Sequence, residues 1–223
     1  MGGASDAPPD FLLKLTYLSR HCTTAWNVAG RLQGTMDLPL ADVGIRETQA
    51  NVGAVRALGV RRIVCSTARR AYQTATLYAD ALQLPIHRTP RLRELDHGNW
   101  EGREMEDLLL DPNSGYAQCL SNPGCIAIPG GSESVQAAQH RAVEVVRDVA
   151  LSFRGESVLI VAHKHLNAVL MCGLLKRPFT SFANYIVEDT RPHLLAADAV
   201  DALCLGAAWA ASSDGSGGQV AFS

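Results

Sequence analysis

Three apolar runs in this 223-residue chain are each followed by cationic or imidazole side chains, and this repeated feature constrains the fold more than any other. The first run begins at Leu15 and alternates apolar with polar residues, whereas residues 62–66 and 157–162 are almost continuously apolar. Alternation is typical of a strand, and a short continuous run is typical of a strand buried on both faces of a parallel sheet. We therefore expect at least three strands whose carboxyl ends carry charge.

Stretches with helical spacing separate these runs. Apolar residues recur at helical intervals over residues 42–58, 67–84, 134–153 and 166–175. Residues 193–197 and 202–208 resemble a closing pair of strands. Strands that alternate with helices predict an α/β fold with a largely parallel sheet. We expect a single domain over residues 1–223, with frayed ends at about 1–10 and 212–223.

Two regions have weaker patterns. Residues 86–92 resemble a strand but contain Pro90, which favours a position at the edge of the sheet. Residues 103–131 are rich in proline and glycine, and one short helix is expected there, near residues 104–110. A loop of that length in a compact domain is commonly a functional lid.

Composition excludes several classes of partner. Apolar residues make up 47% of the chain and charged residues 19%, with a formal net charge of −2, so neither nucleic acid nor an anionic membrane is expected as a partner. No stretch reaches the ~20 apolar residues that span a membrane. The six cysteines are scattered and the first ten residues lack signal-peptide anatomy, which favours the cytoplasm. A second copy of the chain, in a homodimer, stays open as a partner.

The residues at the three strand ends predict an anion site. Arg20 and His21 follow the first run, Arg69 and Arg70 lie shortly after the second, and His163 follows the third. The carboxyl ends of parallel strands lie along one edge of a sheet, so these side chains are expected to share one crevice. Like charges repel, and a bound anion would compensate that repulsion. The arginine fork suits phosphate oxygens in particular.

Four motifs then give a family resemblance. R-H-C-T-T-A-W-N runs from Arg20 to Asn27, and a G-R-x-Q-G-x-x-D-x-P-L pattern occupies residues 30–40. S-x-x-x-R-A-x-Q-T-A occupies residues 66–75, and L-x-E-x-x-x-G-x-W-E-G occupies residues 92–102. Together with the strand that ends at His163, they resemble the histidine phosphatase superfamily, which includes the cofactor-dependent phosphoglycerate mutases. The resemblance implies a phosphoglycerate mutase-like fold, a three-layer sandwich with a mainly parallel central sheet flanked by helices.

The resemblance also implies covalent phosphoryl transfer without a metal or a cofactor. His21 would attack phosphorus to form a phosphohistidine, and Glu94 would protonate the leaving alcohol and then deprotonate water. His21 must be neutral to attack, and the cations Arg20 and Arg70 are expected to lower its pKa. The phosphate oxygens would be held by Arg20, Arg70, Asn27 and His163. The substrate-binding residues are expected to be Asn27, Thr24, Gln33, Gly34 and Lys164.

Two departures from the family pattern lie beside the chemistry. Cys22 stands where glycine is usual, so its thiol would either have a lowered pKa and oxidise readily, or merely fill space. Lys164-His165 replaces a Gly-Gly pair, which would either add a cation to the pocket rim or point to solvent.

Several other side chains have no motif role. His87, His97 and His140 are expected at the surface, and Trp100 is expected to pack the loop that carries Glu94 against the domain. Arg191 lies near the position at which members of the resembled family line the active site, so a contact with substrate is left open.

The preferred interpretation is a phosphomonoesterase that acts on a small phosphorylated metabolite. The first alternative is a phosphoglycerate mutase, which uses the same pocket but shields the phosphoenzyme from water; residues 103–131 are short for such a lid. The second is an inactive phospho-ligand-binding protein, which the retained His21, Arg70, Glu94 and His163 disfavour. Sugar phosphates, phosphoserine, nucleotides and pathway-specific intermediates all stay open as substrates.

Overall fold

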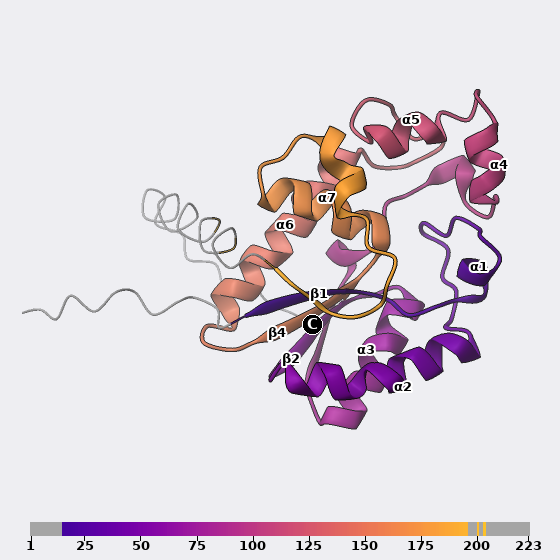
Figure 1. Cartoon of the computed structure of the whole chain (residues 1–223). Coiled ribbons are helices and arrows are strands. Elements are labelled where there is room, and N and C mark those ends of the chain that lie inside the picture. The colour runs from indigo at the N-terminus through magenta and orange to yellow at the C-terminus, as the bar shows by residue number, and fades with distance from the viewer. Residues whose placement is uncertain (1–14, 196–199, 201–202, 204–223) are drawn as a thin grey trace, which may run out of the picture.

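The computed structural model describes residues 15–195, Val200 and Leu203. A five-stranded sheet in the order β3-β2-β4-β1-β5 forms its centre (Figure 1). The strands are β1 (Thr16–Arg20), β2 (Arg62–Ser66), β3 (Ile86–Thr89), β4 (Val158–Ala162) and β5 (His193–Leu194). The first four strands pair in parallel, and β5 pairs with β1 in the antiparallel direction. The expected α/β fold with a mainly parallel sheet is confirmed.

The register of β4 brings the charged strand ends together. Arg20 at the end of β1 pairs with Ala162, and Cys65 near the end of β2 pairs with Val161. The N–H of His21 extends the ladder by donating to the carbonyl of Ala162 at 3.0 Å. Because these strands are parallel and nearly in register, their carboxyl ends lie at one edge of the sheet.

Helices cover both faces of this sheet. Leu159 and Val161 of β4 belong to a hydrophobic cluster with residues of α2 (Asp42–Ala57) and α3 (Arg69–Leu82). Ile160, between them, points to the other face and packs with residues of α6 (Val135–Ser152) and α7 (Lys164–Leu174). The two helix pairs lie on opposite sides of the strands (Figure 1), which gives the three layers that were expected.

The main helices begin and end within two residues of the expected bounds, because local signals set them. Ser134 caps α6 by accepting the N–H of Ala137 at 3.1 Å. Gln83 ends α3 in the left-handed conformation, with φ of 55°. His163 is the N-cap of α7, so this helix starts directly after β4 and two residues earlier than expected.

The strand bounds differ more from expectation. β3 lies at the sheet edge as expected, but it ends at Thr89 because Pro90 has no N–H for the ladder and begins the 3₁₀ turn η1 (Pro90–Leu92). β5 is shorter than the expected 193–197, whose last residues fall outside the described part. The expected strand 202–208 also falls outside it, apart from Leu203, which is helical.

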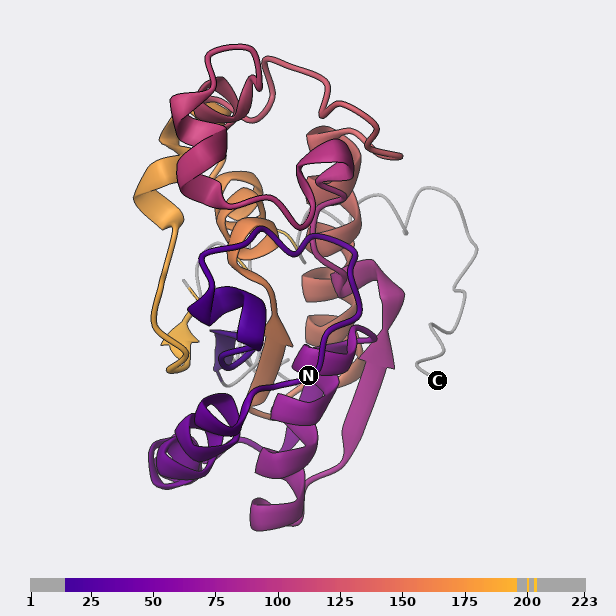
Figure 2. The same cartoon turned by 90° about the vertical axis from the view of Figure 1, so that its right-hand side faces the viewer.

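The region from 103 to 131 is more ordered than its composition indicates. The expected short helix is α4 (Met105–Leu110), but α5 (Tyr116–Ser121) was not expected, and Figure 2 shows both above the sheet. Trp100 is buried and its indole N–H donates to the carbonyl of Ser114 at 3.0 Å, so it packs its loop onto the domain as expected.

The remaining short helices are α1 (Ala25–Val28), η2 (Gly98–Trp100) and η3 (Phe179–Tyr185). Within the described residues, every helix is too short or too polar to cross a membrane.

Candidate active site

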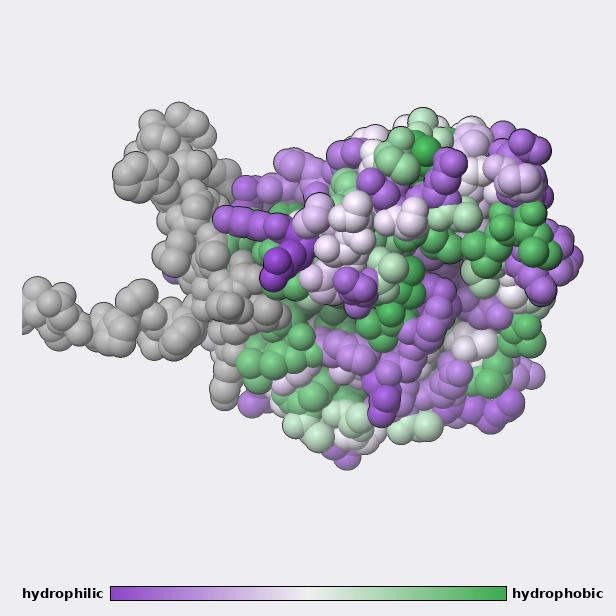
Figure 3. Space-filling view, turned by 45° about the horizontal axis from the view of Figure 1, so that its top comes forward, coloured by the Kyte–Doolittle hydropathy of each residue, from purple (hydrophilic) through white to green (hydrophobic). Residues whose placement is uncertain are grey.

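A cleft of about 150 Å³ opens at the carboxyl ends of β1 and β4. In the space-filling view, hydrophilic residues run across a hollow in one face of the molecule (Figure 3). Eight of the ten expected site residues line the cleft, namely Arg20, His21, Asn27, Gln33, Gly34, Arg70, Glu94 and Lys164. The other two, Thr24 and His163, are fully buried beneath it.

His21 directly follows β1 and is 3% exposed. Its Nδ1 lies 2.8 Å from the carbonyl oxygen of Cys22, and a carbonyl can only accept, so Nδ1 carries the proton. Nε2 is therefore unprotonated and accepts a hydrogen bond from Nε of Arg70 at 3.1 Å, and both residues line the cleft. Burial, followed by the charges of Arg70 and Arg20, holds the pKa of His21 well below its usual value. The expected direction is confirmed, although burial rather than the arginines is the largest cause.

Arg70, in the first turn of α3, connects His21 to the loop that contains Gly34 and Met36. Its guanidinium donates to the carbonyl of Met36 at 2.6 Å and to that of Gly34 at 2.8 Å, besides its bond to His21. Burial lowers the pKa of Arg70 to about 10, so the side chain still carries its charge at neutral pH.

His163 lies behind His21 instead of in the cleft wall. The two imidazole rings are 5.2 Å apart, and Nε2 of His163 is 2.9 Å from the hydroxyl oxygen of Ser66. Burial, then the charge of Arg70, keeps the pKa of His163 well below its usual value. A neutral imidazole at this position can orient His21 without adding a third cation.

Glu94 is held at the opposite wall by the first turn of α7. Its Oε1 accepts the backbone N–H groups of Leu166 at 2.8 Å and Leu95 at 3.0 Å, and its Oε2 accepts that of His165 at 3.2 Å. The carboxyl group is 7% exposed and lines the cleft. This places a carboxyl group in the same cleft as His21.

The rim carries a cluster that sequence reasoning missed. Glu188 lines the cleft, forms an ion pair with Lys164, and accepts from the guanidinium of Arg20 at 3.2 Å. Burial raises the pKa of Glu188, but Lys164 and Arg20 outweigh it and lower the pKa overall. Of the two alternatives for Lys164, the structure therefore supports the one in which it adds a cation to the rim of the cleft. No sequence motif marks Glu188, whereas Arg191 is exposed, pairs with Asp189 and is not among the lining residues.

The expected substrate-binding residues divide into lining and supporting groups. Asn27 lines the cleft, but its Oδ1 accepts from the backbone N–H and the hydroxyl of Thr24, which closes the cap of α1. Thr24 therefore supports Asn27 from below. Gly34 has a φ of 52°, a left-handed conformation that favours glycine, and a Cβ there would displace the side chain of Glu101, whose Oε1 would lie 2.0 Å away.

The structure decides between the two alternatives for Cys22 and shows that the expected exposure of His97 was wrong. Cys22 is fully buried and burial raises the pKa of its thiol, so it fills space and is not a reactive thiolate. His97 is buried instead of exposed, and its Nε2 lies 2.9 Å from Nδ1 of His165, which is also buried. Burial lowers the pKa of both imidazoles. Of the other two histidines, His140 is exposed and His87 is only partly so.

One group of side chains in the described part of the chain has the spacing of metal ligands. Glu94, His97 and His165 each offer one ligand atom, and these atoms lie within 4.8 Å of one another. His165 follows β4 in sequence and His97 follows β3, so only the tertiary fold brings them together.

Comparisons with known proteins agree with this geometry. Residues 16–199 match the family model described as "Histidine phosphatase superfamily (branch 1)". The chain is 34% identical over 163 residues to a probable phosphoglycerate mutase GpmB of Yersinia pestis, covering 73% of this chain and 75% of that protein. The chain belongs to the histidine phosphatase superfamily.

Solved structures of phosphatases share the fold. A mycobacterial glucosyl-3-phosphoglycerate phosphatase in complex with VO3 is 26% identical, with a TM-score of 0.70 over 81% of this chain and 96% of that one. The α-ribazole phosphatase of Shigella flexneri is 28% identical, with a TM-score of 0.67 over 78% and 86% of the two chains. The family and its structural neighbours support a phosphatase or phosphotransferase enzyme.

Proposed function

We propose that the chain hydrolyses a small phosphorylated metabolite through a phosphohistidine on His21. The observation that carries the proposal is the tautomer of His21, a cleft-lining residue whose unprotonated Nε2 accepts from the guanidinium of Arg70. A neutral imidazole with an oriented lone pair is a competent nucleophile, and a buried arginine at 3.1 Å can neutralise the transferred phosphoryl group.

The first step forms the phosphoenzyme. As the phosphate binds, the Nε–H of Arg70 turns from His21 to a phosphate oxygen, and the Nε2 lone pair attacks phosphorus. The ester P–O bond breaks with its electron pair on the leaving oxygen, and the carboxyl proton of Glu94 passes to that oxygen. Nδ1–H keeps its bond to the Cys22 carbonyl, which stabilises the positive charge on the ring.

The second step releases phosphate. The Glu94 carboxylate takes a proton from water, whose oxygen attacks phosphorus, and the P–N bond breaks with its electron pair returned to Nε2. Arg20 and Arg70 neutralise the equatorial oxygens in both steps, and Asn27, which also lines the cleft, assists them. Charge neutralisation by arginine means that no step needs a metal ion.

The best test is direct capture of the intermediate. Brief exposure to a ³²P-labelled phosphomonoester followed by denaturing quench should leave acid-labile, base-stable label on the protein. His21→Ala should carry none, and His140→Ala, which changes an exposed imidazole on α6, should be labelled like the wild type. Label recovered at wild-type level in His21→Ala would refute the assignment. Screening a panel of phosphomonoesters for phosphate release would then identify the substrate.

A phosphoglycerate mutase activity is the second candidate, because of the 34% identity to the probable mutase. The region from 103 to 131 holds only the short helices α4 and α5, which argues for access of water to the phosphoenzyme. With 3-phosphoglycerate and a trace of the bisphosphate, we expect negligible isomerisation. Fast mutase turnover would reverse the ranking of the two functions.

A further inference from the structure

The contact between His97 and His165 has no part in phosphoryl transfer as derived above. Both side chains are less than 5% exposed, and their rings meet edge to face with centroids 4.9 Å apart. A lysine and a histidine occupy the two positions after His163, where the family commonly has a glycine pair, so the second imidazole is a departure of this chain from the family pattern. Two buried imidazoles beside a carboxylate are a set of side chains that can donate lone pairs to a metal ion.

The three groups converge on one point of the cleft wall. Nε2 of His97 and Nδ1 of His165 are 2.9 Å apart, and an oxygen of Glu94 completes a set with all separations within 4.8 Å. Glu94, His97 and His165 all line the cleft, so an ion can reach them from solvent. The backbone N–H groups on Glu94 use some of its lone pairs, but a carboxylate has about four, so it can still coordinate an ion.

We propose that His97, His165 and Glu94 form an inhibitory site for a divalent transition-metal ion such as Zn²⁺. Two imidazoles and one carboxylate, with a fourth position open to the cleft, match the ligand set of open zinc sites. Tetrahedral zinc with ligand distances of about 2.0–2.1 Å separates two nitrogens by roughly 3.3 Å, so the histidines move apart by a few tenths of an ångström on binding.

The affinity of this site for a metal ion is limited by the surroundings of the two histidines. The outer nitrogens, Nδ1 of His97 and Nε2 of His165, have no hydrogen-bond partner among the described residues. Ligating histidines commonly donate that N–H to a carboxylate or carbonyl, and each missing partner costs about 10–100-fold in affinity. We therefore expect binding in the micromolar range, far weaker than that of a structural zinc site.

Occupation of the site would stop the reaction proposed above, and this consequence rests on the proposed function. A carboxylate bound to zinc cannot carry the proton that the leaving alcohol needs, and an ion beside the cleft obstructs the leaving group. Metal binding itself does not depend on the proposed function, because it requires only the three ligands.

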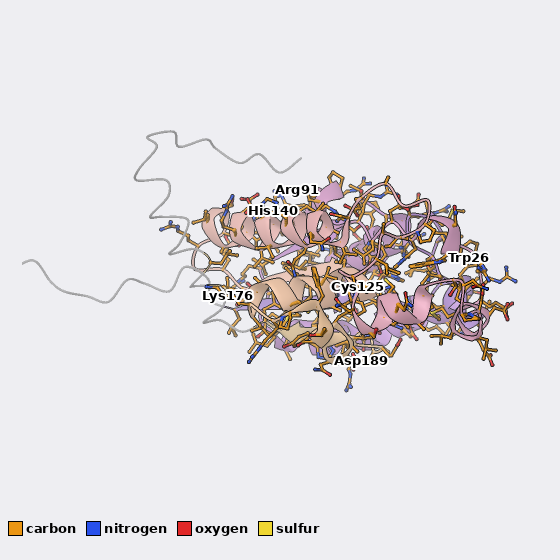
Figure 4. All side chains as sticks on the ribbon, turned by 90° about the horizontal axis from the view of Figure 1, so that it is seen from above. Trp26, Arg91, Cys125, His140, Lys176 and Asp189 are labelled. Atoms are coloured by element: carbon orange, nitrogen blue, oxygen red, sulfur yellow. The ribbon has the colours of Figure 1, made fainter. Side chains whose placement is uncertain are left out.

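Binding is measured first, without substrate, with Co²⁺ as a spectroscopic probe of the same site. The wild type should bind one equivalent with visible absorption bands of tetrahedral cobalt, and Zn²⁺ should displace it. His165→Gly, which restores the residue usual in the family, and His97→Gln should each weaken binding at least ten-fold. His21→Ala should keep the bands, which separates this site from the nucleophile. His140→Gln, on the outer side of α6 (Figure 4), should also keep them.

Inhibition is measured second, with p-nitrophenyl phosphate and with an alkyl phosphate. Micromolar Zn²⁺ should inhibit the wild type and be at least ten-fold less potent against His165→Gly. Absence of Co²⁺ binding, or unchanged binding in both ligand variants, would overturn the metal site. If binding and its loss in the variants are observed but no phosphohistidine forms on His21, the proposed function fails and the metal site stands.

Discussion

Acidification from pH 7.5 to 5.5 should remove a large part of the protein's stability, because four imidazoles are buried in and around the cleft. Burial is the largest cause of a lowered pKa for His21, His97, His163 and His165. Below the unfolded value of about 6.5, each imidazole takes up a proton in the unfolded chain but stays neutral in the folded one. The unfolded state then binds more protons, so the free energy of unfolding falls as the pH falls.

The magnitude follows from linkage. A histidine that stays neutral in the folded chain throughout this interval loses about 1.4 kcal/mol of stabilisation, so His21, His163 and His165, whose pKa values lie well below the usual one, together lose up to about 4 kcal/mol. His97, whose pKa is lowered less far, adds a smaller loss. Small domains have unfolding free energies of about 5–15 kcal/mol, so the effect is large enough to bring the protein near its unfolding midpoint.

The assay is urea-induced unfolding followed by circular dichroism at pH 7.5, 6.5 and 5.5, with metal chelator present throughout. His97→Gln removes the buried imidazole whose pKa is lowered least and should reduce the pH-dependent loss by at most about a quarter. His140→Gln, the exposed control, should leave the loss unchanged. A wild-type loss below about 1 kcal/mol would refute the reasoning, because it would require these imidazoles to be protonated as readily in the folded chain as in the unfolded one.

Three further outcomes are expected. Glu94→Gln should reduce turnover of an alkyl phosphate by about 10²–10⁴-fold but have a much smaller effect on p-nitrophenyl phosphate, whose leaving group needs no proton; equal losses would remove Glu94 from the acid role. Exhaustive EDTA treatment should preserve activity and added magnesium should not raise it, whereas a loss restored by a divalent ion would contradict the metal-free mechanism. Glu188→Gln removes the ion pairs to Arg20 and Lys164 and so frees both cations to bind substrate. Because the Glu188 side chain is 69% exposed, the gain is discounted to about 1 kcal/mol, which is a decrease of about five-fold in KM. An unchanged or raised KM would contradict this role of Glu188.

The strands and their charged ends could be predicted because the signals are local. The apolar run of β4 and the polar residue that follows it are adjacent in sequence, so His163 could be assigned to the sheet edge without a structure. The helix α5 was missed because Pro112, Gly115 and Pro123 surround it, and these residues indicate loops when tertiary contacts are unknown. Its buried Tyr116 packs on Trp100 with ring centroids 5.4 Å apart, a contact that no sequence pattern reveals.

The site residues that were missed depend on contacts between distant segments. Glu188 reaches Arg20 because the chain returns past β1 to form β5, and His97 meets His165 across the cleft wall. A lowered pKa for Cys22 was one of the two alternatives because the neighbouring arginines were visible in the sequence, whereas the burial that raises the pKa was not.

The hydrogen bonds of Arg70 hold one side of the cleft more firmly than the other. Gly34 and Met36 are anchored through their backbone to the same guanidinium that contacts the nucleophile, so any change of that loop's shape also displaces Arg70 from His21. The opposite rim is held at Glu188 by side-chain ion pairs open to solvent. Efforts to redirect this enzyme to new substrates should therefore begin with the segment around Glu188 and leave residues 34–36 untouched, because changes around Glu188 do not touch the hydrogen bonds that hold Arg70 beside His21.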